Sequence, residues 1–244
     1  MIDTVIVYCV LPSPDLICLD GWVRRYGKNG IYFVKRIGHF RFKIVWGVLF
    51  VSFSAPLVLY GSNIYQYVED DYEQLNALFM LVVSKAVGEE FGKLPLKQWE
   101  VSKIDFCCNY TVDRLPFDKK AVEAAIRFVK KTEVPYCKMR RYESSSFGVN
   151  KTRKVLIYDK CKEREAKIRN YTPQRIDKVI RVEIGLRLTI LRKEFDQGVL
   201  FGEVARQEAA DLIIRKHLKT YQLDKPFCSM DQVLSAIKTK AKNA

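Results

Sequence analysis

The residues best suited to chemistry lie in a short stretch where a tyrosine ends an apolar, β-branched run. Tyr158 follows Val155–Ile157, with Lys160 two residues on and Glu163 five residues on. A phenol among cations is suited to attack a phosphodiester, which would leave DNA covalently attached to the protein through the tyrosine oxygen. A simpler interpretation is a strand-end tyrosine whose hydroxyl meets a polar partner. The rest of the sequence has to decide between the two.

Two further expected strands each carry an acid among apolar residues. In a strand from Trp99 to Tyr110, alternation places Asp105 on the face opposite its apolar neighbours. In a strand from Val179 to Leu188, Glu183 and Arg181 share a face. If these strands and that of Tyr158 belong to one sheet, we expect both acids to lie beside the phenol.

Carboxylates in that position indicate a hard divalent cation. Mg²⁺ and Mn²⁺ take oxygen ligands, usually one or two carboxylates together with substrate phosphate. Asp105 and Glu183 are therefore the candidate metal ligands, with Glu163 as a third. The simpler interpretation is that the two strand acids are surface charges, paired with Lys103 and Arg181.

The distribution of charge indicates a polyanionic partner. The chain has 244 residues and a net charge of +14, but residues 1–100 hold ten basic and ten acidic residues, so the excess lies beyond residue 100. From Lys138 to Lys193 basic residues outnumber acidic ones more than twofold. A basic half joined to a neutral half is typical of nucleic-acid binding. The candidate DNA-binding residues are Lys138, Arg140, Arg141, Lys151, Arg153, Lys154, Lys162, Arg164 and Arg181.

Cysteine usage and hydropathy bear on the compartment. The seven cysteines form no Cys-x-x-Cys pair, and only His39 and His217 are available to join them, so a zinc site is poorly supported. Reduced thiols in a cytoplasm are the simple interpretation. We see no signal peptide, and the apolar run from Trp46 to Tyr60 is too short to span a bilayer, so we expect no membrane partner.

The periodicities predict an α+β fold, with a largely antiparallel sheet, flanking helices and a helical C-terminal segment. Two domains are expected: residues 1–196, comprising a neutral half (residues 1–100) and a basic half (residues 101–196), and a helical segment 197–244. The expected strands are 2–11, 31–37, 40–53 (after a turn at 38–39), 99–110, 155–158 and 179–188. The expected helices lie at about 71–92, 116–129, 160–169, 201–219 and 230–241, while 136–149 is ambiguous.

Several segments, in this order, resemble the replication initiators of filamentous phages and related plasmids, the gene II/X family of rolling-circle nicking–closing enzymes. They are Met1–Asp3, Ser54–Tyr65, Val101–Asp105, Val155–Glu163 and Ile180–Glu183. Each segment alone is weakly specific, and their order and spacing carry the resemblance across residues 1 to about 195. The chain is shorter than full-length phage initiators.

The resemblance implies that Tyr158 is the nucleophile of the nicking domain. We expect its attack to form a 5′-phosphotyrosine, and the nearby Lys160 or a metal to stabilise the phenolate. It implies metal roles for Asp105, Glu183 and Glu163, with Mg²⁺ or Mn²⁺ as cofactor. The partner is then origin DNA, single-stranded or supercoiled, with host helicase and polymerase as further partners in the cytoplasm of a bacterial cell. The chain lacks the His-hydrophobe-His metal motif of the wider rolling-circle class, so the implied site is all-carboxylate.

Other functions stay open. The main alternative is a non-catalytic DNA-binding protein of replication control, which would keep the basic surface and tolerate loss of Tyr158. An RNA-binding module is a second alternative, because aromatics such as Tyr136 and Tyr142 would stack on bases. A tyrosine recombinase is disfavoured, since histidine is scarce.

Overall fold

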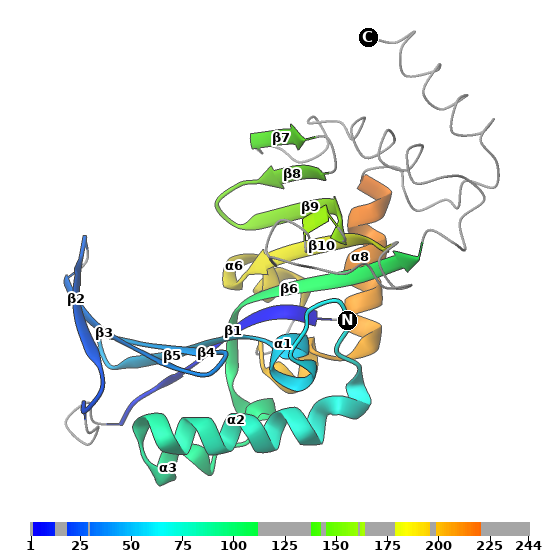
Figure 1. Cartoon of the computed structure of the whole chain (residues 1–244). Coiled ribbons are helices and arrows are strands. Elements are labelled where there is room, and N and C mark those ends of the chain that lie inside the picture. Colours follow the sequence, from blue (N-terminus) through cyan, green and yellow to red (C-terminus); the bar gives the residue numbers. More distant parts are fainter. Residues whose placement is uncertain are drawn as a thin grey trace, which may run out of the picture. The chain divides into compact units, whose positions relative to one another are not determined.

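The computed structural model has the α+β architecture that the sequence predicts, with a large antiparallel sheet and several helices (Figure 1). It describes residues 2–12, 19–28, 30–111, 138–142, 145–160, 162–163, 179–195 and 199–220. The chain forms two compact units, the first from Met1–Phe106 with Gly185–Asp211 and the second from Cys107–Ile184 with Leu212–Ala244. This division by packing differs from the predicted boundary at residue 196. In the described ranges, no helix is long and apolar enough to cross a membrane.

The first unit is built on antiparallel strands in the spatial order β2-β3-β4-β5-β1-β6. Figure 1 shows β2 to β5 drawn out as an arm of this unit. Strands β6 and β10 each continue from one unit into the other. The strands are β1 (Ile2–Val10), β2 (Val23–Gly27), β3 (Gly30–Ile37), β4 (Phe40–Val45), β5 (Val48–Ser54) and β6 (Glu100–Thr111).

The hairpins of this arm correct the sequence prediction in two places. The turn at residues 38–39 is confirmed, but the predicted strand 40–53 is wrong, because Trp46 and Gly47 form a turn between β4 and β5. Both turn residues have positive φ, 48° and 70°, as a two-residue hairpin of the mirror-image type requires. Trp-Gly is not a common turn pair, so no local pattern indicated this turn. Strand β2 was missed because its residues are all exposed and show no buried face.

One face of the first unit's sheet is buried. Along β4, Phe40, Phe42 and Ile44 are buried while the intervening Arg41 and Lys43 are exposed, as the alternation predicts. Helix α2 (Tyr72–Val87) adds Phe79, whose ring lies 5.7 Å from that of Phe53 and 5.0 Å from that of Trp99. Such aromatic pairs add about 0.5–1.5 kcal/mol each beyond the area they bury.

The remaining helices of the first unit are short. Asp71, the residue before α2, makes no side-chain capping bond to that helix and instead accepts a hydrogen bond from the backbone N–H of Val68. The predicted helix to residue 92 divides at Gly88, whose φ is 108°. The bounds are α1 (Ala55–Tyr60), η2 (Glu69–Asp71), α3 (Glu89–Gly92), η3 (Leu96–Gln98), α6 (Leu188–Glu194) and α7 (Phe201–Val204).

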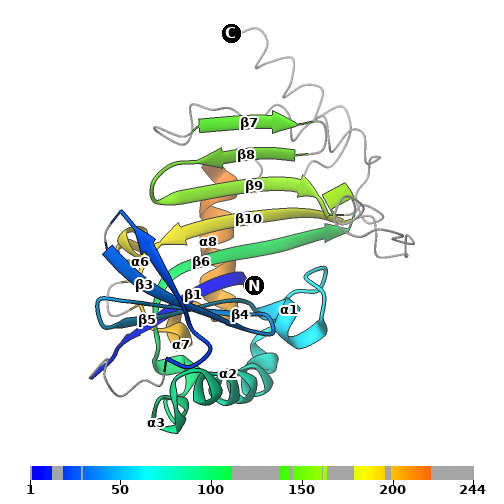
Figure 2. The ribbon, with the colours of Figure 1, turned by 60° about the vertical axis from the view of Figure 1, so that its left-hand side comes forward.

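The second unit holds the strand order β10-β9-β8-β7, and Figure 2 shows successive arrows pointing in opposite directions. The region 136–149, ambiguous in sequence, contains β7 (Lys138–Tyr142) and β8 (Ser145–Val149). Strand β9 (Arg153–Asp159) confirms the tyrosine-bearing strand, and β10 (Val179–Arg187) confirms the acid-bearing one. The predicted helix 160–169 is described only at residues 160, 162 and 163, which are helical.

Helix α8 (Gln207–Thr220) begins in the first unit and ends in the second. Its apolar stripe is buried through Ala210, Ile213 and Ile214, which is the pattern of an amphipathic helix. Together with α7 it replaces the single helix predicted at 201–219. The predicted helices at 116–129 and 230–241 lie outside the described residues.

Candidate active site

Tyr158 and Glu183 meet on one side of the second unit's sheet, as strand alternation predicts. The Tyr158 hydroxyl donates a hydrogen bond of 2.6 Å to Glu183 Oε1. Tyr158 is 6% exposed and Glu183 is 4% exposed, so the bond is shielded from water. A nucleophile bonded to a base at this distance has the geometry that proton transfer requires.

Lys160 completes the immediate surroundings of the phenol. The strand ends at Asp159, and Lys160, the next residue, turns its ammonium back to the hydroxyl of Tyr158, 3.2 Å away. The same ammonium forms an ion pair of 2.6 Å with Glu163. Lys160 is almost fully buried, and a buried ammonium needs such partners to offset its desolvation.

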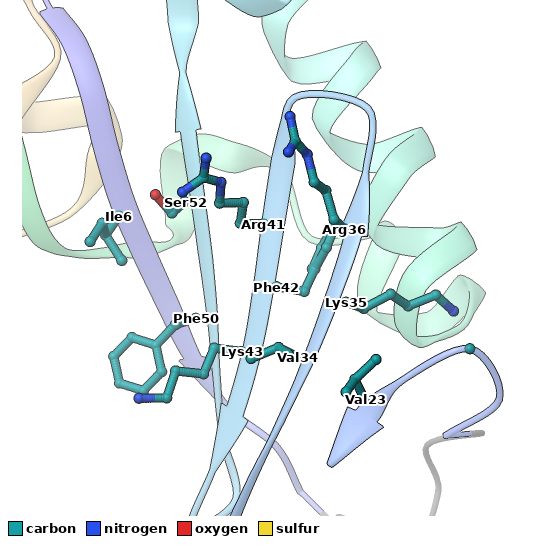
Figure 3. Close-up of a pocket in the computed structure, with 11 residues that line it drawn as sticks. Ile6, Val23, Val34, Lys35, Arg36, Arg41, Phe42, Lys43, Phe50 and Ser52 are labelled. Carbon is teal, nitrogen blue, oxygen red and sulfur yellow. The ribbon is translucent and has the colours of Figure 1, made fainter. Parts of the chain in front are cut away.

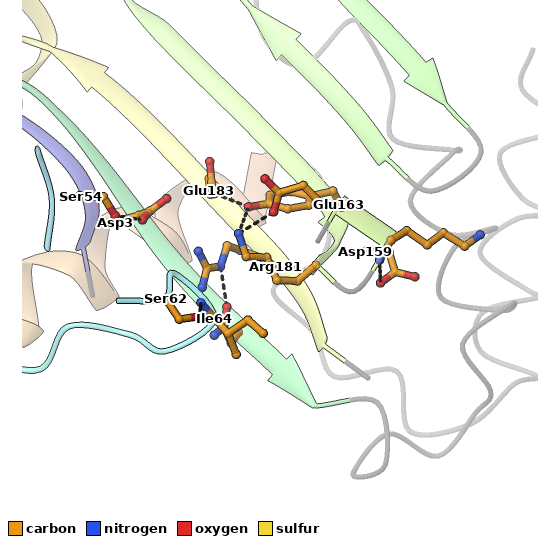
Figure 4. A network of polar contacts seen from close by, with 12 residues as sticks. Asp3, Ser54, Ser62, Ile64, Asp159, Glu163, Arg181 and Glu183 are labelled. Atoms are coloured by element: carbon orange, nitrogen blue, oxygen red, sulfur yellow. Dashed lines mark hydrogen bonds and ion pairs between the residues drawn. The ribbon is translucent and has the colours of Figure 1, made fainter. Parts of the chain in front are cut away.

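A second layer of cations lies around Glu183. Lys154 lies four residues before Tyr158 on the same strand, and its Nζ forms an ion pair with Glu183 Oε2 at 3.1 Å. Arg181 is fully buried, and its Nε donates to Asn109 Oδ1 at 2.8 Å. Figure 4 shows Glu163, Arg181 and Glu183 gathered at this place, with Asp159 apart from them. Asn109 and the Lys154–Glu183 pair were not anticipated as members of a site.

The surroundings determine the protonation of the phenol. Burial raises the pKa of Tyr158 well above its ordinary value, and the Glu183 carboxylate raises it further. The positive charge of Arg181 acts in the opposite direction and lowers this pKa, while Glu163 raises it. At neutral pH the hydroxyl therefore keeps its proton, and reaction requires a group that accepts it.

The three predicted metal ligands do not form one described group. Asp105 belongs to the first unit, where it forms an ion pair with Lys103 at 3.1 Å, the partner that the simpler interpretation assigned to it. Glu183 pairs with Lys154 rather than with Arg181. Among the residues that the structure describes, no three His, Cys, Asp or Glu side chains gather as a metal site. Glu183 and Glu163 remain the two carboxylates around Tyr158 and Lys160.

The predicted DNA-binding residues fall into distinct environments. Lys138 and Arg140 are exposed on β7, and the strand register puts them on the side of the sheet that carries Lys154 and Tyr158. Lys151 is exposed in the turn before β9. Arg181 is buried, so its charge acts inside the site. Arg153 and Lys162 are half-buried, whereas Arg164 and the side chain of Arg141 lie outside the described residues.

Neither the models of known protein families nor the curated proteins give a match to this chain. The segments that carry the resemblance to the gene II/X initiators can be located in the fold. Ser54–Tyr65 covers the end of β5 and helix α1, and Val101–Asp105 lies in β6. Val155–Glu163 and Ile180–Glu183 supply the Tyr158–Glu183–Lys160 cluster itself.

Proposed function

We propose that the chain is a rolling-circle DNA replication initiator that nicks one strand with Tyr158 as nucleophile and later closes it. The observation that carries the proposal is the hydrogen bond of 2.6 Å from the Tyr158 hydroxyl to Glu183, with Lys160 3.2 Å from the same oxygen. A phenol, an acceptor for its proton and a cation for the resulting phenolate are the three components that tyrosine attack needs.

In the proposed step, the Tyr158 oxygen bonds to phosphorus and its proton passes to Glu183. The bond from phosphorus to the 3′-oxygen breaks, and that oxygen takes a proton from solvent to become a free 3′-hydroxyl. Lys160 balances the negative charge on the phenol oxygen during the transfer. The phosphotyrosine ester conserves the energy of the broken bond, so a later 3′-hydroxyl reverses the attack and returns the proton through Glu183.

The donor set around the phenol fits a Mg²⁺ or Mn²⁺ ion. Such ions bind through one or two carboxylates plus substrate phosphate, and Glu183 and Glu163 supply two carboxylates beside Tyr158 and Lys160. A bound ion would supply charge neutralisation at the phosphoryl group. The metal role of Asp105 stays a prediction. Origin DNA, host helicase and polymerase, and a bacterial cytoplasm belong to the same proposal.

Covalent trapping tests the proposal. The full-length protein is incubated with Mg²⁺ or Mn²⁺ and a pool of 3′-labelled single-stranded oligonucleotides of random sequence, then run on a denaturing gel. We expect a labelled protein band that Tyr158→Phe abolishes. The matched control is Tyr60→Phe, which removes another hydroxyl bonded to a carboxylate, that of Asp71. An adduct of equal strength in Tyr158→Phe would discard the nucleophile.

One observation favours a second candidate, the non-catalytic DNA-binding protein. Tyr158 is buried and its pKa is raised, which is also the state of a tyrosine that only supports the fold. In that case the wild-type protein yields no adduct with either cation, while it still retains labelled DNA in a native gel.

A further inference from the structure

The arm of the first unit has an open face opposite its buried one. We use "open face" for the outward side of β3, β4, β5 and β1. Strand pairing places Arg36, Arg41, Ser52 and Ile6 in one row across these strands. A parallel row holds Val34, Lys43, Phe50 and Tyr8. Directly opposed residues of neighbouring strands lie on the same side of a sheet, so both rows face the same way.

The charges on the open face call for an anionic partner. Arg36 and Arg41 are exposed and directly opposite each other, a like-charge arrangement that destabilises a sheet unless a counter-charge is present. They line a cavity of about 430 Å³ together with Lys43, as Figure 3 shows. None of the eleven described residues that line it is acidic. Among the described residues of these two rows and their extension onto β6, the acidic one is Glu100, which lies opposite Tyr8 and accepts a hydrogen bond from it.

Aromatic rings alternate with these cations. Lys43 Nζ lies 4.5 Å from the ring centre of Tyr32, which is on the same side of β3. Phe50 is half-buried next to Lys43 in Figure 3, and its ring centre lies 5.7 Å from that of Tyr8. A face with phosphate-binding cations beside flat, accessible rings is the arrangement that single-stranded nucleic acids use, because their bases are free to stack.

We infer that the open face is a second DNA-binding surface, which holds single-stranded DNA through Arg36, Arg41 and Lys43 on phosphates and through Phe50 and Tyr32 on bases. It lies in the half of the chain whose net charge is zero, so total charge gave no indication of it. The choice of DNA over RNA rests on the proposed function. The cations and rings themselves are properties of the face, independent of Tyr158.

Fluorescence anisotropy of the full-length protein with a labelled 20-nucleotide DNA strand of mixed sequence tests the inference. Each phosphate contact on a single strand contributes about 0.7 to the slope of log affinity against log salt. Arg36→Ala/Arg41→Ala should therefore lower the slope by about 1.4 and weaken binding about 25-fold at 0.1 M salt. The matched control, Lys85→Ala/Lys93→Ala, removes two charges from the helical layer and should leave affinity within about twofold.

The thermal unfolding midpoint is measured for each variant, and we expect Arg36→Ala/Arg41→Ala to unfold no earlier than wild type, because two like charges are removed. Unchanged affinity and slope in a folded double variant overturn the inference. Tighter binding of single-stranded RNA or duplex DNA through the same arginines overturns the assignment of the ligand. An arginine effect without any covalent adduct would refute the proposed function alone, and an adduct without an arginine effect would refute this inference alone.

Discussion

Replacement of Glu183 by glutamine tests the proton acceptor at the centre of the proposed mechanism. The substitution keeps the shape of the side chain and an oxygen that can accept from the Tyr158 hydroxyl, but it removes the negative charge 2.6 Å from that oxygen. The carboxylate raises the pKa of Tyr158, so its loss moves that pKa down toward the ordinary value, although burial still keeps it high. Glu183→Gln therefore has a more acidic phenol and no base to take its proton.

The more acidic phenol and the missing base of Glu183→Gln have effects on the reaction rate that can be distinguished by varying the pH. General-base catalysis typically contributes a factor of about 100 to 10,000, so we expect Glu183→Gln to lose that factor at pH 7, which equals about 3–5 kcal/mol of barrier. Without a base the phenol must lose its proton to solvent. The rate of the variant should then rise about tenfold per pH unit, while the wild-type rate changes less. The assay is single-turnover formation of the covalent adduct between pH 7 and 9.5.

The matched control is Glu163→Gln, which removes a neighbouring carboxylate that pairs with Lys160 rather than with the phenol. If Glu163 serves the metal, additional Mg²⁺ should restore its adduct formation, and the steep pH dependence of Glu183→Gln should be absent. A rate for Glu183→Gln equal to wild type at pH 7, or a deficit of the same size at pH 7 and 9.5, would refute the assignment of Glu183 as base.

Two further predictions concern stability. Because burial raises the pKa of Tyr158 in the fold, its stabilising contribution is complete below the unfolded value of about 10 and is lost progressively above it. Between pH 10 and pH 11, Tyr158→Phe should therefore lose about 1 kcal/mol less of its stability toward urea than the wild type. A Cβ on Gly92 would overlap Ser84 Oγ and lie 2.9 Å from the Met80 carbonyl oxygen. Gly92→Ala should therefore cost about 1–3 kcal/mol in urea unfolding, and Ser84→Ala in the same chain should recover only a fraction of it.

Strand alternation was sufficient to place the core of the candidate site. Period two assigns Glu183 and Arg181 to one side of their strand, and a sheet that contains Tyr158 then brings the phenol and the acid together. Lys160 lies beyond the end of the expected strand 155–158. The observed strand ends one residue before Lys160, and the long lysine side chain still reaches the phenol.

Strand alternation did not predict which side chains pair with one another across neighbouring strands. It gives the face of a residue but not its position along the neighbouring strand, which is set by register. Asn109, which shares the expected period with Asp105, accepts a hydrogen bond from Arg181 that alternation alone did not indicate. Likewise, Lys154 was taken as a phosphate contact because of its charge alone. Its pairing with Glu183 depends on a register that no local pattern encodes.

Two errors in the strand prediction, the end of β10 and the missed strand β2, have local causes. The sequence from Arg187 to Ile190 alternates like a strand, but the chain turns into helix α6 at Leu188, where no capping residue marks the start. Strand β2 has no buried side and therefore no apolar alternation. In both cases tertiary pairing decides the structure, and local propensity is too weak to indicate it.

The catalytic and the structural interpretation of the cluster of Tyr158, Glu183 and Lys160 predict different effects when the Tyr158 hydroxyl is removed. If Tyr158, Glu183 and Lys160 only support the fold, loss of the hydroxyl leaves Lys154 as the ion-pair partner of the buried Glu183 carboxylate, and the cost is confined to unfolding. If the cluster is catalytic, the cost falls mainly on bond formation with DNA, because the phenol is held protonated next to its acceptor until a phosphate arrives. The ratio of lost adduct formation to lost stability in Tyr158→Phe therefore distinguishes the two interpretations.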